Sequence, residues 1–309
     1  MELCLEKSDF LGSFDLLWSK DLDEYKKNKL NLFVLKINSN EFDYDLLIDM
    51  LVDPVVDYSI SRQVKEKYKD RVGTLSRKAR EKFVEYTRNN GELGELLLFC
   101  FLETHLKAPK ILTKLELKTS TSHYVNGADG VHVLKLPGGD YQLIFGESKT
   151  YEDMSRAISD AFQSINDFKH GVNDKGNQKS GLQYEKSLIS DNLFKESFSE
   201  EDYNFLESLI YPTKERKFDV DNAFGVFIGF QINITDDDKA MLNAEFRKKI
   251  KDIVDSEVSK RIEYIQKKIK DHNLQGHNFY IYVLPFTDIS NKRKKIMEAI
   301  TKWLYWKIW

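Results

Sequence analysis

The segment from Gly127 to Lys149 constrains the fold of this chain more than any other. Two runs rich in β-branched and aromatic residues, 131–136 and 141–145, flank the turn sequence Pro-Gly-Gly-Asp at 137–140. Such runs around Gly-Gly are typical of a β-hairpin. The segment therefore predicts two antiparallel strands, the second of which runs back past the start of the first.

Charged residues stand at the open end of this hairpin. Asp129 precedes the first arm, and Glu147 and Lys149 end the second. Since side chains alternate along a strand, Glu147 and Lys149 share a face and Ser148 points to the other. A pair of carboxylates attracts a hard cation such as Mg²⁺, which polarises a phosphate and activates water, and a lysine stabilises the developing charge. A structural ion pair between Glu147 and Lys149 is the alternative interpretation.

Length and composition exclude several classes of protein. The 309 residues suffice for one large domain or two ordinary ones, and the net charge of −3 excludes a polycation that coats nucleic acid. No apolar run approaches the roughly 20 residues that span a bilayer, and the start lacks the pattern of a signal peptide. We expect a cytoplasmic protein without a membrane partner. The two cysteines, Cys4 and Cys100, have no neighbours at zinc-ligand spacing.

The first 90 residues predict a mostly helical N-terminal region. A strand is expected at 30–37, a helix at 46–52 and an amphipathic helical stretch at 61–88 that breaks near Gly73. Basic residues cluster at 62–80 and again at 292–295. Each cluster is read as a solvated helix face or as a set of phosphate contacts.

Residues 91–309 predict the second and larger domain. A strongly apolar helix starts after Gly91 and carries Glu92 and Glu95 three residues apart. The helix dipole explains Glu92 as a charge at a helix start, and it explains Glu95 less well. A strand at 112–118, the two hairpin arms and a helix at 151–170 follow. Two continuous apolar runs, at 223–232 and 279–285, predict strands buried on both faces.

A loop and several helices complete this second domain. We expect a loop at 171–181, a helix from Ser199, a long charged helix at 236–270 and a last helix at 291–309. The tryptophan-rich end of that last helix is read as a partner surface or as ordinary packing on the sheet.

This order of elements resembles the PD-(D/E)xK nuclease superfamily, which has the restriction-endonuclease-like fold. The resemblance implies that Asp129 and Glu147 ligate Mg²⁺ or Mn²⁺ together with the backbone carbonyl of Ser148. It assigns Glu95 to a second ion or to orienting the attacking water, and Lys149 to positioning that water and stabilising the phosphate. The aspartate lies in Ala-Asp-Gly here and does not follow a proline.

Two further residues are second choices for the site. Glu92 is the alternative acid on the first helix. Gln163 lies where some relatives place a glutamine, although Asp167 stands where those relatives have a tyrosine.

A finer resemblance is to the HamA family, the nuclease subunits of the two-component Hachiman anti-phage defence system. It rests on the segments 91–97, 127–132, 146–149 and 157–161. The resemblance implies DNA as substrate and a helicase partner, HamB, which senses aberrant DNA and restrains the nuclease until infection.

The sequence thus predicts an α/β protein with a restriction-endonuclease-like core, a central mixed sheet flanked by helices, and a mostly helical N-terminal region. The expected activity is metal-dependent hydrolysis of DNA phosphodiesters with little sequence preference. Two alternatives remain. One is a non-catalytic regulatory or DNA-binding subunit on a nuclease-like scaffold, and the other is a stand-alone restriction or repair endonuclease.

Overall fold

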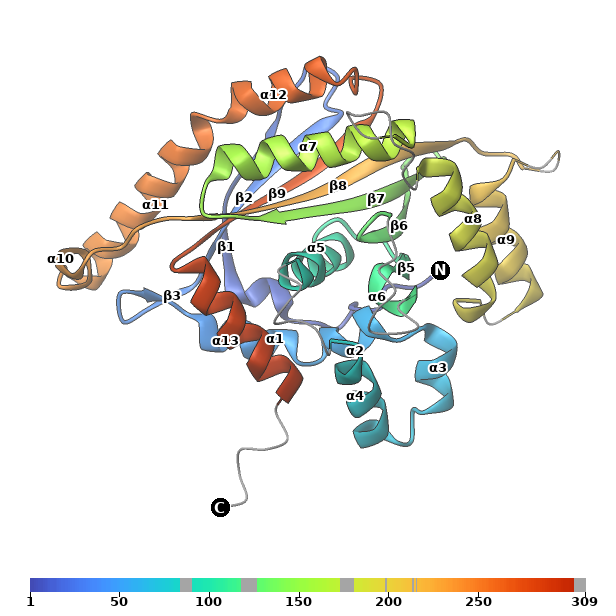
Figure 1. The fold of residues 1–309 in the computed structure, drawn as a ribbon, viewed down its shortest axis with the longest axis horizontal. Helices are drawn as coiled ribbons and strands as arrows, with labels where there is room; N and C mark the ends of the chain where they lie inside the picture. Colours follow the sequence, from blue (N-terminus) through green and yellow to red (C-terminus); the bar gives the residue numbers. More distant parts are fainter. Residues whose placement is uncertain are drawn as a thin grey trace.

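A computed structural model describes residues 1–83, 91–117, 127–172, 181–197, 199–212, 214 and 216–302. Within them, a central sheet of seven strands has the order β1-β2-β9-β8-β7-β6-β5 (Figure 1). The strands are β1 Phe14–Asp21, β2 Asn28–Leu35, β5 Lys110–Thr113, β6 Gly130–Lys135, β7 Tyr141–Thr150, β8 Val220–Gln231 and β9 Asn278–Phe286. β3 (Ile37–Asn38) and β4 (Glu41–Phe42) form a separate small hairpin.

The sheet is mixed, as the sequence predicts. The four central strands β2, β9, β8 and β7 pair in parallel, and antiparallel strands β1 on one side and β6 and β5 on the other complete the sheet. The expected hairpin is confirmed as β6 and β7, with Val131 opposite Phe145. Its turn includes Gly139 at φ +96°, a left-handed conformation that favours glycine.

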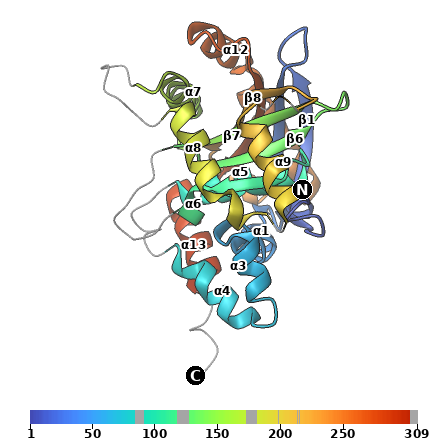
Figure 2. The same ribbon diagram turned by 90° about the vertical axis from the view of Figure 1, so that its right-hand side faces the viewer.

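Helices cover both faces of the sheet, in three layers. α7 (Met154–His170), α11 (Asn243–Ser259) and α12 (Ile262–Asp271) lie on one face, and α5 (Glu92–Thr104) lies on the other (Figure 1). Beneath α5 are α1 (Tyr44–Leu51), α2 (Pro54–Ser59), α3 (Arg62–Lys67), α4 (Val72–Glu81) and α13 (Ile289–Lys302). Figure 2 shows α8 (Leu182–Asn192) and α9 (Glu200–Ile210) at the end of the sheet nearest the viewer.

The N-terminal region is less helical than the sequence suggests. β1 and β2 from this region join the sheet, where β2 pairs in parallel with β9 near the other end of the chain. The region also docks on α5 through buried polar groups. The Glu103 carboxylate accepts the N–H of Cys4 at 2.7 Å and the N–H of Lys110 at 2.7 Å. The expected domain boundary at residue 90 falls outside the described residues and stays a prediction.

A second buried cluster joins the start of β5 to α2 and α6, and α3 to the segment after α8. The fully buried Lys110 ammonium donates to the carbonyl of Asp57 at 2.8 Å and pairs with Glu116. Glu196 accepts the backbone N–H of Arg62 at 3.3 Å. Burial raises the pKa of Glu196 from 4.5 to about 8, even though Lys110 and Arg62 lower it. This carboxyl therefore favours its protonated form in the folded protein.

Two sequence expectations are wrong in detail. The strand expected at 112–118 ends at Thr113, and a short helix, α6 (Lys114–Leu117), replaces the rest. Thr113 and Glu116 form a capping box: the Glu116 carboxylate accepts the Thr113 N–H at 3.2 Å, and the Thr113 hydroxyl accepts the Glu116 N–H at 3.3 Å. These reciprocal bonds start a helix where the apolar pattern suggests a strand.

The long helix expected at 236–270 is broken into α10 (Asp236–Lys239), α11 and α12. The Asn40 side chain donates to the carbonyls of Lys239 at 3.0 Å and Met241 at 2.7 Å. These carbonyls would otherwise accept bonds from the next helical turn, so a distant side chain ends α10. The loop expected at 171–181 and the tryptophan-rich terminus lie largely outside the described residues.

Candidate active site

The site begins where β7 extends beyond its neighbour β6. β6 starts at Gly130, whereas β7 continues to Thr150 while paired only with β8. Asp129 covers this free edge: its N–H donates to the Gly146 carbonyl at 2.9 Å, and its Oδ2 accepts the Ser148 N–H at 2.8 Å. The carboxylate thus satisfies a strand N–H that would otherwise be buried without a partner.

Ser148 also holds Asp129 through its side chain. The Ser148 hydroxyl donates to the same Oδ2 at 2.9 Å, from the face of β7 that packs on α5. Gly94 of α5 permits this close packing, because a Cβ there would lie 2.9 Å from Thr150 Oγ1 and 3.2 Å from Ser148 Oγ. Two donors therefore fix one oxygen of Asp129 and leave Oδ1 directed away from the strand.

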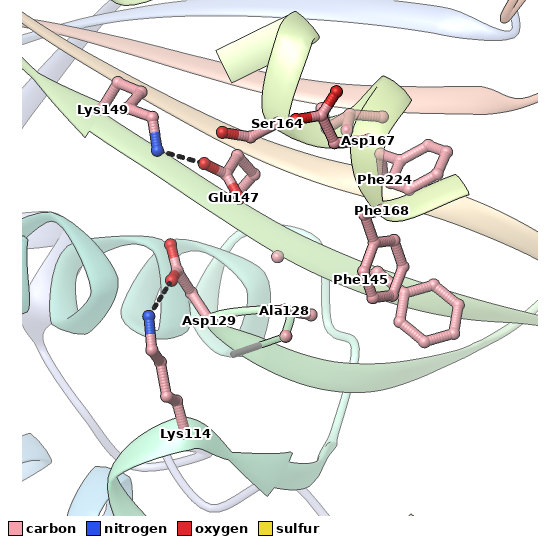
Figure 3. A pocket seen from close by; sticks show the side chains of 13 residues that line it. Lys114, Ala128, Asp129, Phe145, Glu147, Lys149, Ser164, Asp167, Phe168 and Phe224 are labelled. Carbon is pink, nitrogen blue, oxygen red and sulfur yellow. Dashed lines mark hydrogen bonds and ion pairs between the residues drawn. The ribbon is translucent and has the colours of Figure 1, made fainter. Parts of the chain in front are cut away.

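Glu147 and Lys149 lie on the opposite face of β7, as the alternation of the strand predicts. Their side chains form an ion pair and line, with Asp129, one pocket of about 260 Å³ (Figure 3). The structure therefore brings together the three residues predicted at the open end of the hairpin. The pocket wall opposite β7 comes from α7, with Ser164, Ile165, Asp167 and Phe168.

Glu95 lies next to this pocket and does not line it. Its Oε2 accepts the hydroxyl of the fully buried Tyr58 at 3.0 Å, and its Oε1 lies 3.6 Å from the Lys114 ammonium. Lys114 does line the pocket, and its Nζ is 3.3 Å from Asp129 Oδ1. Lys114 therefore connects the acid of α5 to the aspartate of the hairpin.

Burial and mutual repulsion shift the ionisation of these acids. Burial first, and then the Asp129 carboxylate, raises the pKa of Glu95 to about 7, against the opposing effects of Lys114 and Tyr58. Burial and Asp129 likewise raise the pKa of Glu147, although Lys149 opposes them. Burial lowers the pKa of Lys149, but the carboxylates of Glu147 and Asp129 outweigh it and leave that pKa above its ordinary value. Closely spaced acids with opposing lysines are a common arrangement at catalytic sites.

The donor set suits a small divalent cation. Mg²⁺ is usually held by one or two carboxylates and several waters, and Asp129 and Glu147 provide two carboxylates in a pocket with room for water. Among the described residues, no group of three or more His, Cys, Asp or Glu side chains is arranged to hold a metal ion, so the protein would supply at most two such ligands in this pocket. The arrangement therefore fits a partly hydrated Mg²⁺ or Mn²⁺ better than a fully protein-bound ion such as structural zinc.

Comparison with known proteins supplies the family. The family model HamA matches residues 12–300 of the 309-residue chain. The chain belongs to the HamA family. This places it among components of the Hachiman anti-phage defence system. No curated protein matches the chain. Within the described residues of this HamA chain, no helix is long and apolar enough to cross a membrane.

The two second-choice residues of this HamA family member lie behind the site. Glu92 is 1% exposed at the start of α5 and does not line the pocket. Gln163 also lies outside the pocket, but its Nε2 donates to Asp167 Oδ1 at 2.8 Å, and Asp167 is part of the wall. Gln163 therefore supports a residue of the pocket wall.

Sequence reasoning missed one residue that lines the pocket, Lys114, and two that support it, Tyr58 and Glu185. Lys114 is the first residue of α6, and the Thr-x-x-Glu pattern of the capping box that starts this helix is visible in the sequence. Tyr58 and Glu185 come from distant helices without a recognisable motif. Glu185 is 2% exposed and packs on Gly127, two residues before Asp129, and burial raises its pKa to about 7.

Proposed function

We propose that this HamA family member is a metal-dependent nuclease that hydrolyses DNA phosphodiesters with little sequence preference. One observation carries the proposal: Asp129, Glu147 and Lys149, from the two arms of one hairpin, line a single pocket. Two carboxylates and a lysine at such an opening are the groups that phosphoryl transfer to water requires.

Each residue has a defined task in this proposal. Asp129 and Glu147 would hold Mg²⁺, and the bound ion would polarise the phosphate and lower the pKa of water. Ser148 fixes the direction of Asp129 through the two bonds described above. The Lys149 ammonium, now paired with Glu147, is placed to stabilise negative charge on the phosphate or to hold the attacking water. Glu95 is placed to act through Lys114 and Asp129.

The DNA substrate and the helicase partner rest on membership of the HamA family. We propose that the chain acts as the effector subunit of a two-component Hachiman system, in the cytoplasm, and that the helicase restrains it until infection. Co-expression with the helicase encoded beside it tests this point. A stable complex supports the proposal, and two proteins that never associate would favour a stand-alone nuclease.

Cleavage of supercoiled plasmid tests the activity itself. We expect wild type to cleave with Mg²⁺ and not with EDTA in at least one of two formats, alone or with the helicase present. In that format Glu147→Gln and Lys149→Met should lose at least about a hundredfold in rate. Glu152→Gln is the matched control, since Glu152 is an exposed acid two residues beyond β7. Equal cleavage by wild type and Glu147→Gln would refute the site. Tight DNA binding without any cleavage would indicate a regulatory scaffold.

A further inference from the structure

Lys114 occupies a position between two carboxylates of the site. Its ammonium lies 3.3 Å from Asp129 Oδ1 and 3.6 Å from Glu95 Oε1, and its side chain is 19% exposed. It enters from α6, on the side of the pocket opposite Glu147 and Lys149 (Figure 3). The pocket is thus lined by two lysines on opposite sides, Lys114 from α6 and Lys149 from β7.

Lys114 contacts the carboxylate oxygens that do not accept hydrogen bonds from Ser148 or Tyr58. Asp129 Oδ2 accepts the N–H and the hydroxyl of Ser148, and Glu95 Oε2 accepts the hydroxyl of Tyr58. Oδ1 of Asp129 is therefore the oxygen that this residue would offer to a cation, and Lys114 contacts it. The second oxygen that Lys114 contacts, Oε1 of Glu95, lies outside the pocket.

We propose that Lys114 is a tethered counter-ion of this site, which competes with the divalent cation for Asp129 and leaves the carboxylates when the ion binds. The inference rests on the proposed function, since it assumes that the pocket binds a metal ion. The Lys114 ammonium, 3.3 Å from Asp129 Oδ1, would repel a divalent ion bound to the same oxygen at about 2.1 Å. Metal binding therefore favours movement of the Lys114 side chain away from Asp129.

The Lys114 counter-ion should stabilise the metal-free protein and lower the affinity of the site for a divalent ion. Without Lys114, the carboxylates of Glu95, Asp129 and Glu147 would repel one another in a largely buried region. With Lys114 present, its positive charge offsets part of this repulsion before any ion binds. Loss of the ammonium should thus lower the stability of the metal-free protein and tighten metal binding, whereas a purely structural lysine would change stability alone.

Binding of Mn²⁺ to the full chain, without DNA, tests the proposal. Free Mn²⁺ is counted by electron paramagnetic resonance during titration of wild type, Lys114→Met and Lys114→Arg. We expect Lys114→Met to bind at least about tenfold more tightly, because a unit charge about 4 Å from an ion has a large effect at a protein surface. Lys114→Arg keeps the charge and should stay within about twofold of wild type.

Two further variants complete the design. Lys67→Met removes one charge from an exposed position on α3, away from the pocket, and should leave the Mn²⁺ affinity unchanged. Lys114→Gln keeps a polar side chain and should also tighten binding, so the test survives if Lys114→Met does not fold. If Lys114→Met and Lys114→Gln bind Mn²⁺ as tightly as wild type or more weakly, the counter-ion proposal is wrong and the nuclease proposal is unaffected. Absence of Mn²⁺ binding in every variant, wild type included, would overturn both.

Discussion

Replacement of Ser148 by alanine should weaken the support of Asp129 by a predictable amount. The change removes the 2.9 Å bond from the hydroxyl to Asp129 Oδ2 and keeps the 2.8 Å bond from the backbone N–H. Hydrogen bonds to charged groups contribute about 1.5–3 kcal/mol. Since one donor remains, we expect Ser148→Ala to lower the free energy of unfolding by about 1.5 kcal/mol, near the lower limit. Close packing on Gly94 leaves little room for water to replace the hydroxyl.

A double-mutant cycle measured by urea unfolding isolates this bond. In the Asp129→Ala background, Ser148→Ala should cost about 1 kcal/mol less than in wild type, because its acceptor is gone. Ser164→Ala makes the same chemical change on another wall of the pocket and should stay within about 0.5 kcal/mol of wild type. An additive cycle, or a loss below about 0.5 kcal/mol for Ser148→Ala, would refute the support of Asp129 by this serine.

Three further predictions concern the surroundings of the site. Gly127→Ala would place a Cβ 2.2 Å from Glu185 Oε2, so the buried Glu185 carboxylate must shift; we expect a loss of about 1 kcal/mol in urea unfolding, and almost none when the same change is made in a Glu185→Ala background. Tyr58→Phe removes the donor to Glu95 and should cost about 1–2 kcal/mol; an unchanged melting temperature would contradict this. Burial raises the pKa of Glu196 to about 8 in the folded protein, above its ordinary value near 4.5, so its contribution to stability should fall as pH rises between these values. Glu196→Gln should make this dependence shallower in melts from pH 5 to 8.5, with the remainder due to Glu95 and Glu185, and an unchanged slope would assign all of it to other groups.

Local patterns were enough to predict the centre of this molecule. The β6–β7 hairpin follows from two apolar runs around a Gly-Gly turn, and β8 and β9 follow from continuous apolar runs buried on both faces. The convergence of Asp129 with Glu147 follows from the same hairpin, because β7 outruns β6 by a few residues. Both the sheet interior and the chemical groups on it are therefore encoded within short windows of sequence.

Features that depend on distant partners were not predictable in this way. β1 is an edge strand in which only Phe14 is buried and half of the residues are exposed, so it has no continuous apolar run. The parallel pairing of β2 with β9 joins segments some 250 residues apart. Asn40 ends α10 from a separate part of the chain, and Tyr58 reaches Glu95 from another helix. In each case a tertiary contact decides the structure, and the local window contains no signal for it.

The most direct test of the account is the position of Mn²⁺ in crystals of the wild-type chain, located by its anomalous scattering. The account predicts one peak within about 2.2 Å of Asp129 Oδ1 and of a Glu147 oxygen, with the Lys114 ammonium displaced from both carboxylates. Crystals of Glu147→Gln should show that peak weakened or lost. A fully occupied ion elsewhere, with Lys114 still on Asp129 and Glu95, would contradict the assignment of this pocket as the metal site.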